Sequence, residues 1–103
     1  MNTQNKVALV TGAGVRVGNV IARQLAKSGA RIAVHHRNSV AEAREFVAEI
    51  KDGGGDADLF QAELADRVQV EALVPAIVER FGSLDILVNS ASVFRDRWLN
   101  ETD

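Results

Sequence analysis

The sequence contains no cysteine, which excludes a disulfide framework, a thiolate nucleophile and a cysteine-ligated zinc site. It carries 12 Lys and Arg against 14 Asp and Glu, so no basic surplus marks a binder of nucleic acid or anionic membranes. No apolar run approaches the roughly 20 residues of a membrane span, and the first residues lack the pattern of a secretory signal. We therefore expect a cytoplasmic protein with neither nucleic acid nor a membrane as its partner.

Tyrosine is also absent. Any mechanism that needs a tyrosine acid is therefore closed to these 103 residues acting alone. The remaining composition is that of a globular protein, with 47% hydrophobic and 25% charged residues, and it supplies enough apolar surface for a core. We expect residues 1–103 to form a single domain.

Short apolar runs alternate with stretches of helical periodicity along the chain. The runs at 6–10, 31–35, 57–61 and 84–88 predict buried strands. Helical patterns lie between residues 17 and 29, 39 and 53, and 66 and 82. Pro75 lies inside the third pattern, so that helix is either kinked or begins later.

This alternation predicts an α/β fold, a Rossmann-like doubly wound parallel sheet in the strand order 3-2-1-4 that stops after the fourth strand. The fourth strand would then have one edge without a neighbour, and the third helix would lie alone on its face. We expect the chain to form a homo-oligomer through that edge, or else to be marginally stable.

Three glycines, Gly12, Gly14 and Gly18, follow the first strand and open the first helix. Backbone N–H groups at a helix N-terminus hold phosphate well, and glycine lets a pyrophosphate approach closely. The spacing from Gly12 to Gly18 is one residue longer than in the usual dinucleotide fingerprint. The alternatives are a dinucleotide-binding turn, which we favour, and a structural turn without a ligand.

Residues 35–39, His-His-Arg-Asn-Ser, stand where NAD-binding folds carry an acid for the ribose 2′-hydroxyl. They include no carboxylate, and Arg37 would attract a 2′-phosphate, with added hydrogen bonds from Asn38 and Ser39. The pattern favours NADP(H) over NAD(H), although Arg37 as a solvated loop residue is the alternative. His35 and His36 should point to opposite sides of their strand, so we expect no metal site.

The segment 11–18, Thr-Gly-Ala-Gly-Val-Arg-Val-Gly, resembles the cofactor-binding turn of the short-chain dehydrogenase/reductase family, with Arg16 in place of the usual middle glycine. Asn-Ser-Ala-Ser at 89–92 is similar to the family's Asn-Asn-Ala-Gly, and the likeness extends from residue 6 to about 95. It implies an NADPH-dependent oxidoreductase that transfers hydride to a carbonyl or imine. The family's catalytic residues lie beyond the fourth strand, so we expect none in this chain and no activity from it alone.

The resemblance also implies which residues contact the cofactor. They are Thr11, Gly12, Gly14, Arg16, Val17, Gly18, His36, Arg37, Asn38, Ser39, Ala62, Glu63, Leu64, Asn89, Ser90 and Ala91. After the third strand the family usually has an Asp that holds the adenine amino group, and this chain has Glu63 there.

A narrower resemblance, to pteridine reductases, rests on Arg16, Ser92 and Phe94. It implies that Arg16 and Ser92 meet both cofactor and pterin, and that Phe94 stacks on the pterin ring. Plain packing is the alternative for Phe94. The alternatives for the protein are the N-terminal part of a 3-oxoacyl or general carbonyl reductase, and a non-catalytic NADP(H)-binding module.

Overall fold

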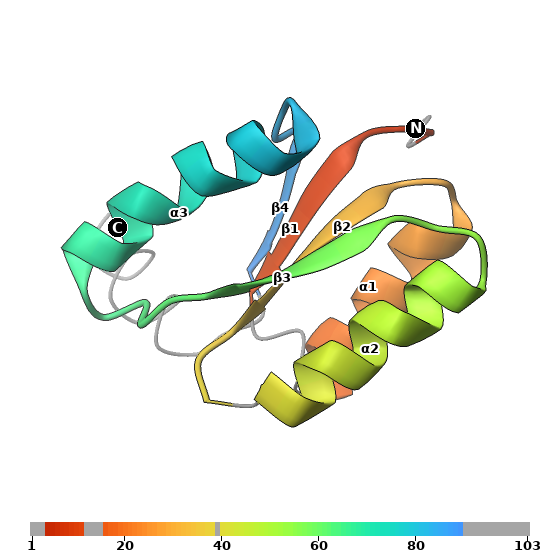
Figure 1. Ribbon diagram of the computed structural model, residues 1–103, viewed down its shortest axis with the longest axis horizontal. Helices are drawn as coiled ribbons and strands as arrows, with labels where there is room; N and C mark the ends of the chain where they lie inside the picture. The colour runs from red at the N-terminus through yellow and green to blue at the C-terminus, as the bar shows by residue number, and fades with distance from the viewer. Residues whose placement is uncertain (1–3, 12–15, 39, 90–103) are drawn as a thin grey trace.

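The computed structural model describes residues 4–11, 16–38 and 40–89, without the side chains of residues 16 and 17. Strands and helices alternate along these ranges (Figure 1). The strands are β1 (Val7–Thr11), β2 (Arg31–His36), β3 (Ala57–Gln61) and β4 (Ile86–Asn89). The helices are α1 (Arg16–Lys27), α2 (Val40–Asp52) and α3 (Arg67–Phe81). None of the helices described is long and apolar enough to cross a bilayer.

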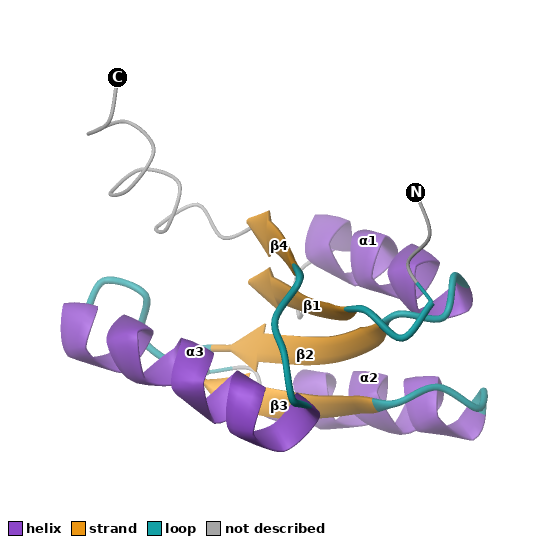
Figure 2. Cartoon of the chain, turned by 90° about the horizontal axis from the view of Figure 1, so that it is seen from above, coloured by secondary structure: helices purple, strands orange, loops and turns teal. Residues whose placement is uncertain are grey.

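The four strands form one parallel sheet in the order β3-β2-β1-β4. Helices α1 and α2 cover one face of the sheet and α3 lies on the other, as Figure 2 shows. The predicted Rossmann-like α/β fold and its strand order are confirmed. Because β1 lies inside the sheet with protein on both faces, all five of its residues are buried, and its sequence is nearly all apolar.

The core consists of two clusters, because successive side chains of a strand point to opposite faces. The cluster under α1 and α2 contains Ala8, Val10, Ala22, Ala30, Ile32, Val34, Ala43, Phe46, Val47, Ile50 and Ala57. The cluster under α3 contains Val7, Leu9, Ala33, Ala62, Leu64, Leu73, Ile77 and Phe81. Each large aliphatic side chain in these clusters contributes about 1.5–3 kcal/mol through burial.

The helices end at glycines, as the sequence predicts for Gly29. Its φ is 96°, a backbone region that favours glycine. Gly29 N–H donates to Ala26 O at 3.0 Å and Ala30 N–H to Leu25 O at 3.1 Å, so two carbonyls of the last turn are satisfied. Gly54 and Gly82, after α2 and α3, also have φ values of 93°. These turns return the chain to the amino edge of the sheet.

Two local expectations need correction. Helix α3 is continuous from Arg67 through Pro75 to Phe81, so the later start is wrong; the predicted cap Asp66 accepts a hydrogen bond from Val68 N at 3.0 Å. Strand β4 begins at Ile86 rather than at residue 84. The reason is that the Asp85 carboxylate accepts the Val7 N–H at 2.9 Å, in place of a backbone carbonyl.

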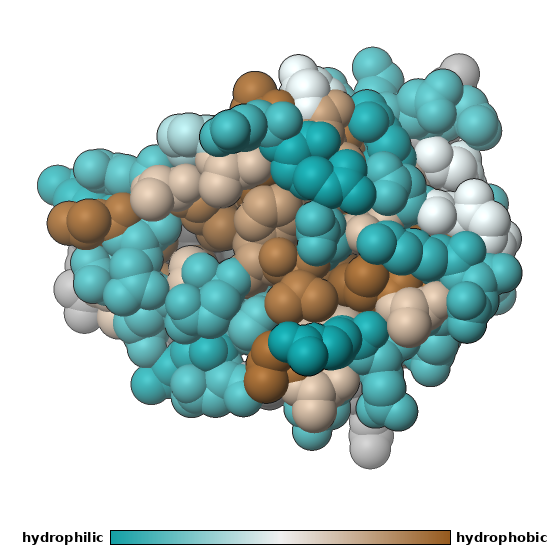
Figure 3. Space-filling model, viewed as in Figure 1, coloured by the Kyte–Doolittle hydropathy of each residue, from teal (hydrophilic) through white to brown (hydrophobic). Residues whose placement is uncertain are grey.

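The outer edge of β3 is partly apolar and flanked by charge. Figure 3 shows hydrophobic residues in a band between α3 and α2, with polar residues around it. Arg80 of α3 bonds Asp58 through Nε at 3.0 Å and Asp56 through Nη2 at 3.1 Å. Charged side chains at an edge strand disfavour pairing with another chain.

Candidate functional site

The carboxyl ends of the four parallel strands meet at one edge of the sheet. The strand order reverses between β1 and β4, and open sheets of this kind bind ligands outside the carboxyl ends at that switch point. Thr11 ends β1 and is paired in register with Asn89, which ends β4. Two of the predicted site residues therefore mark the switch point itself.

Thr11 is 1% exposed, and its hydroxyl is engaged with β4. Oγ1 lies 3.2 Å from the Val88 carbonyl oxygen and 3.3 Å from Asn89 Oδ1. The contact ties the end of β1 to the end of β4 at the residue that leads into segment 12–15. Thr11 thus helps to fix the spacing of β1 and β4 at their carboxyl ends.

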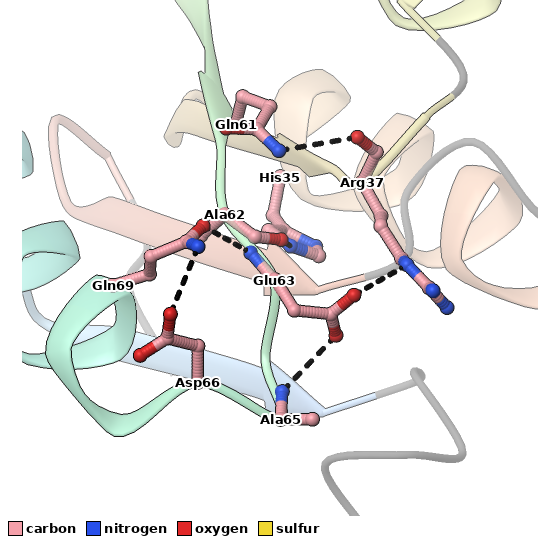
Figure 4. A network of polar contacts seen from close by, with 8 residues as sticks. All are labelled: His35, Arg37, Gln61, Ala62, Glu63, Ala65, Asp66 and Gln69. Carbon is pink, nitrogen blue, oxygen red and sulfur yellow. Dashed lines mark hydrogen bonds and ion pairs between the residues drawn. The ribbon is translucent and has the colours of Figure 1, made fainter.

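Arg37 and Glu63, which follow β2 and β3, form an ion pair (Figure 4). Arg37 Nε lies 2.6 Å from Glu63 Oε2, and the two side chains are 59% and 28% exposed. The contact uses Nε only, and within the described residues no partner lies within bonding distance of the two terminal nitrogens. The structure therefore brings together the residue predicted to meet a 2′-phosphate and the one that replaces the family's adenine-binding Asp.

A hydrogen-bond network fixes Glu63 from the α3 side (Figure 4). Glu63 Oε1 accepts from Ala65 N at 3.1 Å, and Glu63 N donates to Gln69 Oε1 at 2.8 Å. Gln69 Nε2 in turn donates to Asp66 Oδ2, at 3.1 Å. The sequence interpretation missed Gln69, although the pattern Asp66-x-x-Gln69 is a capping-box signal that marks it.

His35 joins the end of β2 to the loop after β3. Its Nε2 donates to the Ala62 carbonyl at 2.9 Å (Figure 4). Burial lowers the pKa of His35 below its usual 6.5, although this hydrogen bond opposes the shift. The ring is therefore a neutral structural group beneath the candidate site.

His36 is 5% exposed, so it is buried rather than open at the strand tip. Neither of its ring nitrogens has a hydrogen-bond partner among the residues that the structure describes. Burial, and next the positive charge of Arg44, lower its pKa. Buried polar atoms without partners are costly. No group of three potential metal ligands occurs among the described His, Asp and Glu residues.

The other predicted site residues fall into two sets. Asn38 is exposed after β2, Gly18 is buried in α1, and Ala62 and Leu64 are buried beside Glu63. Ala62 N donates to His36 O at 3.2 Å, which extends the pairing of β2 and β3. Outside the described residues lie Gly12, Gly14, Ser39, Ser90, Ala91, Ser92 and Phe94, and the side chains of Arg16 and Val17.

The sequence of this chain is similar to those of known proteins. The sequence profile described as "short chain dehydrogenase" matches residues 6–103. The chain belongs to the short-chain dehydrogenase family. The short-chain dehydrogenase/reductase homolog YusS of Bacillus subtilis is 44% identical over 95 residues, which cover 92% of this chain and 87% of that protein. The 3-oxoacyl-[acyl-carrier-protein] reductase FabG of Staphylococcus aureus is 46% identical over 94 residues, covering 91% of this chain but only 38% of FabG.

Solved structures agree with the family assignment. A short chain dehydrogenase from Burkholderia cenocepacia in complex with NADP superimposes with a TM-score of 0.83 at 43% identity, covering 88% of this chain and 37% of that chain. FolM alternative dihydrofolate reductase 1 from Brucella canis, complexed with NADP, gives 0.80 at 36% identity, with coverage of 87% and 35%. This chain therefore corresponds to little more than a third of those enzymes.

Proposed function

We propose that residues 1–103 form a single NADP(H)-binding domain. The observation that carries this proposal is the end of β2, where residues 35–39 include no acid and the Arg37 guanidinium has terminal nitrogens without a partner among the described residues. A 2′-phosphate favours such a group, whereas a free 2′-hydroxyl favours a carboxylate. The proposed cofactor residues are those implied by the family resemblance.

The cofactor, when bound, supplies a hydride from C4 of its nicotinamide. We propose that the complete reaction reduces a carbonyl or a pterin C=N bond. Arg16, Ser92 and Phe94 match the pteridine reductase pattern, and the similarity to FolM supports a pterin substrate. The 46% identity to FabG favours a 3-oxoacyl substrate as the second candidate.

Catalysis by these 103 residues alone is not part of the proposal, because they include no tyrosine. We propose that they bind the cofactor without turnover, as a binding module does. Steady oxidation of NADPH by the purified chain with biopterin or a 3-oxoacyl thioester would contradict this assignment.

Self-association and a cytoplasmic location complete the proposal. Among the described strands β4 pairs only with β1, and Leu87 on it is 54% exposed. An apolar strand with one open edge favours pairing with a second copy. Cell fractionation tests the location.

Calorimetric titration of the chain with NADPH and with NADH tests the cofactor assignment. Arg37→Ala should weaken NADPH binding by about 1.5 kcal/mol, the lower end for a hydrogen bond to a charged group, because the side chain is exposed. NADH binding should hardly change. Lys27→Ala, which removes one positive charge at the opposite edge of the sheet, is the matched control. Tighter binding of NADH than of NADPH by the unmodified chain would disprove the assignment.

A further inference from the structure

Both oxygens of the Glu63 carboxylate have partners within the chain. Oε2 bonds Arg37 Nε at 2.6 Å, Oε1 accepts from Ala65 N at 3.1 Å, and the backbone N–H is held by Gln69 Oε1 at 2.8 Å (Figure 4). A side chain fixed in this way differs from an acid that waits for the adenine amino group.

Within the described part of the chain, the contacts of Arg37 are at Nε and at its backbone carbonyl. Glu63 engages Nε, and Gln61 Nε2 donates to the Arg37 carbonyl at 3.3 Å. The two terminal nitrogens of the guanidinium point outward from these contacts (Figure 4). They form the fork that binds two phosphate oxygens side by side.

On the basis of the proposed NADP(H) function, we propose that Glu63 is a positioning residue for Arg37. It holds the guanidinium in place and so raises the preference for a cofactor with a 2′-phosphate, without touching that phosphate. A long side chain that is already ordered loses less entropy when its ligand binds. The negative charge of Glu63 acts in the opposite direction, but water and salt partly screen it, because the Arg37 side of the pair is exposed. The ordering of Arg37 therefore outweighs the repulsion between Glu63 and the 2′-phosphate, and the net effect of Glu63 favours NADPH.

The test compares variants of the full chain by calorimetric titration with NADPH and with NADH. Glu63→Ala should lower the ratio of NADPH to NADH affinity about three- to fivefold, the effect of one surface ion pair. Glu63→Gln keeps one oxygen that accepts from Arg37 Nε but loses the acceptor for Ala65 N, so it should lower the ratio by less than Glu63→Ala does. Gln69→Ala should lower the ratio by less, because it releases the backbone of Glu63. Glu71→Ala makes the same charge change at a different place, on α3, and should have no effect on the ratio.

A second readout needs no cofactor. In NMR spectra the Arg37 Nε–H signal should be resolved and slow to exchange in the unmodified chain and in Glu63→Gln, and should move to the free-arginine position in Glu63→Ala. An unchanged affinity ratio or unchanged Arg37 signal in Glu63→Ala overturns the inference and leaves the proposed function standing. An unmodified chain that fails to bind NADPH overturns the proposed function, and the inference falls with it.

Discussion

Thr11 Oγ1 lies 3.2 Å from the Val88 carbonyl oxygen and 3.3 Å from Asn89 Oδ1, so one buried hydroxyl joins β1 to β4. The strand order of the sheet reverses between these two strands. The hydroxyl offers a single proton to two acceptors. Its contact with the carbonyl fixes the strands, and its contact with the amide orients Asn89 at the candidate site.

Replacing this hydroxyl tests its contribution to stability. Thr11→Val keeps the branched shape and should lower the free energy of unfolding by about 1 kcal/mol, because partly buried acceptors on β4 lose their donor. Thr11→Ser retains the donor and should lose less. Urea denaturation of the three proteins measures the difference. Equal stability of Thr11→Val and the unmodified chain would show that the contact is energetically neutral.

The buried His35 predicts how stability depends on pH. The pKa of His35 in the folded chain lies below 6.5, mainly because the ring is desolvated. Below about pH 6.5 the unfolded chain therefore binds more protons than the folded chain, and the free energy of unfolding falls as the pH falls. Above that pH both states are neutral at His35, and this contribution is complete and constant. His36 is shifted in the same direction.

Urea denaturation at several values between about pH 7.5 and pH 5.5 measures this slope. His35→Gln keeps a side-chain donor for the Ala62 carbonyl but does not titrate, so its stability should depend less on pH. A free energy of unfolding that rises on acidification over this range would contradict the assignment of a neutral buried ring.

Leu64 tests the packing beneath the candidate site. It is 2% exposed and belongs to the core cluster under α3. Leu64→Ala should cost about 2–5 kcal/mol of stability, since it removes buried surface and leaves a cavity. Val68→Ala truncates a side chain of α3 that is 73% exposed and should cost about 0.5 kcal/mol or less. Similar costs at the two positions would contradict the assignment of Leu64 to the core.

Strand β4 tests the proposed self-association. Sedimentation equilibrium should show a dimer that dissociates on dilution, and Leu87→Lys should shift the chain to the monomer, because a charge then lies on the apolar strand. Val68→Lys, at a side chain of α3 that is 73% exposed, is the control and should leave association unchanged. A monomer at every concentration would contradict this part of the proposal.

The sequence was sufficient for the architecture, because each strand signal is local. The apolar runs before residues 11 and 36 predict strands buried on both faces, and Gly29 and Gly82 mark helix ends through their own backbone preference. The predicted ends of β4 were less accurate. The side chain of Asp85 bonds a residue at the start of the chain, which no local pattern reveals.

The contacts at the candidate site were less predictable, because they depend on the register of neighbouring strands. The sequence singles out Arg37 and Glu63 separately. Their ion pair follows from the pairing of His36 with Gln61, which brings the two strand ends together. His36 was expected among the ligand contacts, and its depth in the protein was not foreseen. Alternation places its ring beside the apolar residues of β2, whatever its own polarity.

The glycine stops after the three helices lie at the edge of the sheet opposite to Arg37, Glu63 and Asn89. The residues that end each helix are thus remote from the residues that would select a dinucleotide. Exchange of side chains after β2 and β3 can redirect ligand choice while the scaffold keeps its shape. The preference for a cofactor with or without a 2′-phosphate can therefore be changed by substitutions in these short loops, while the helices and strands stay as they are.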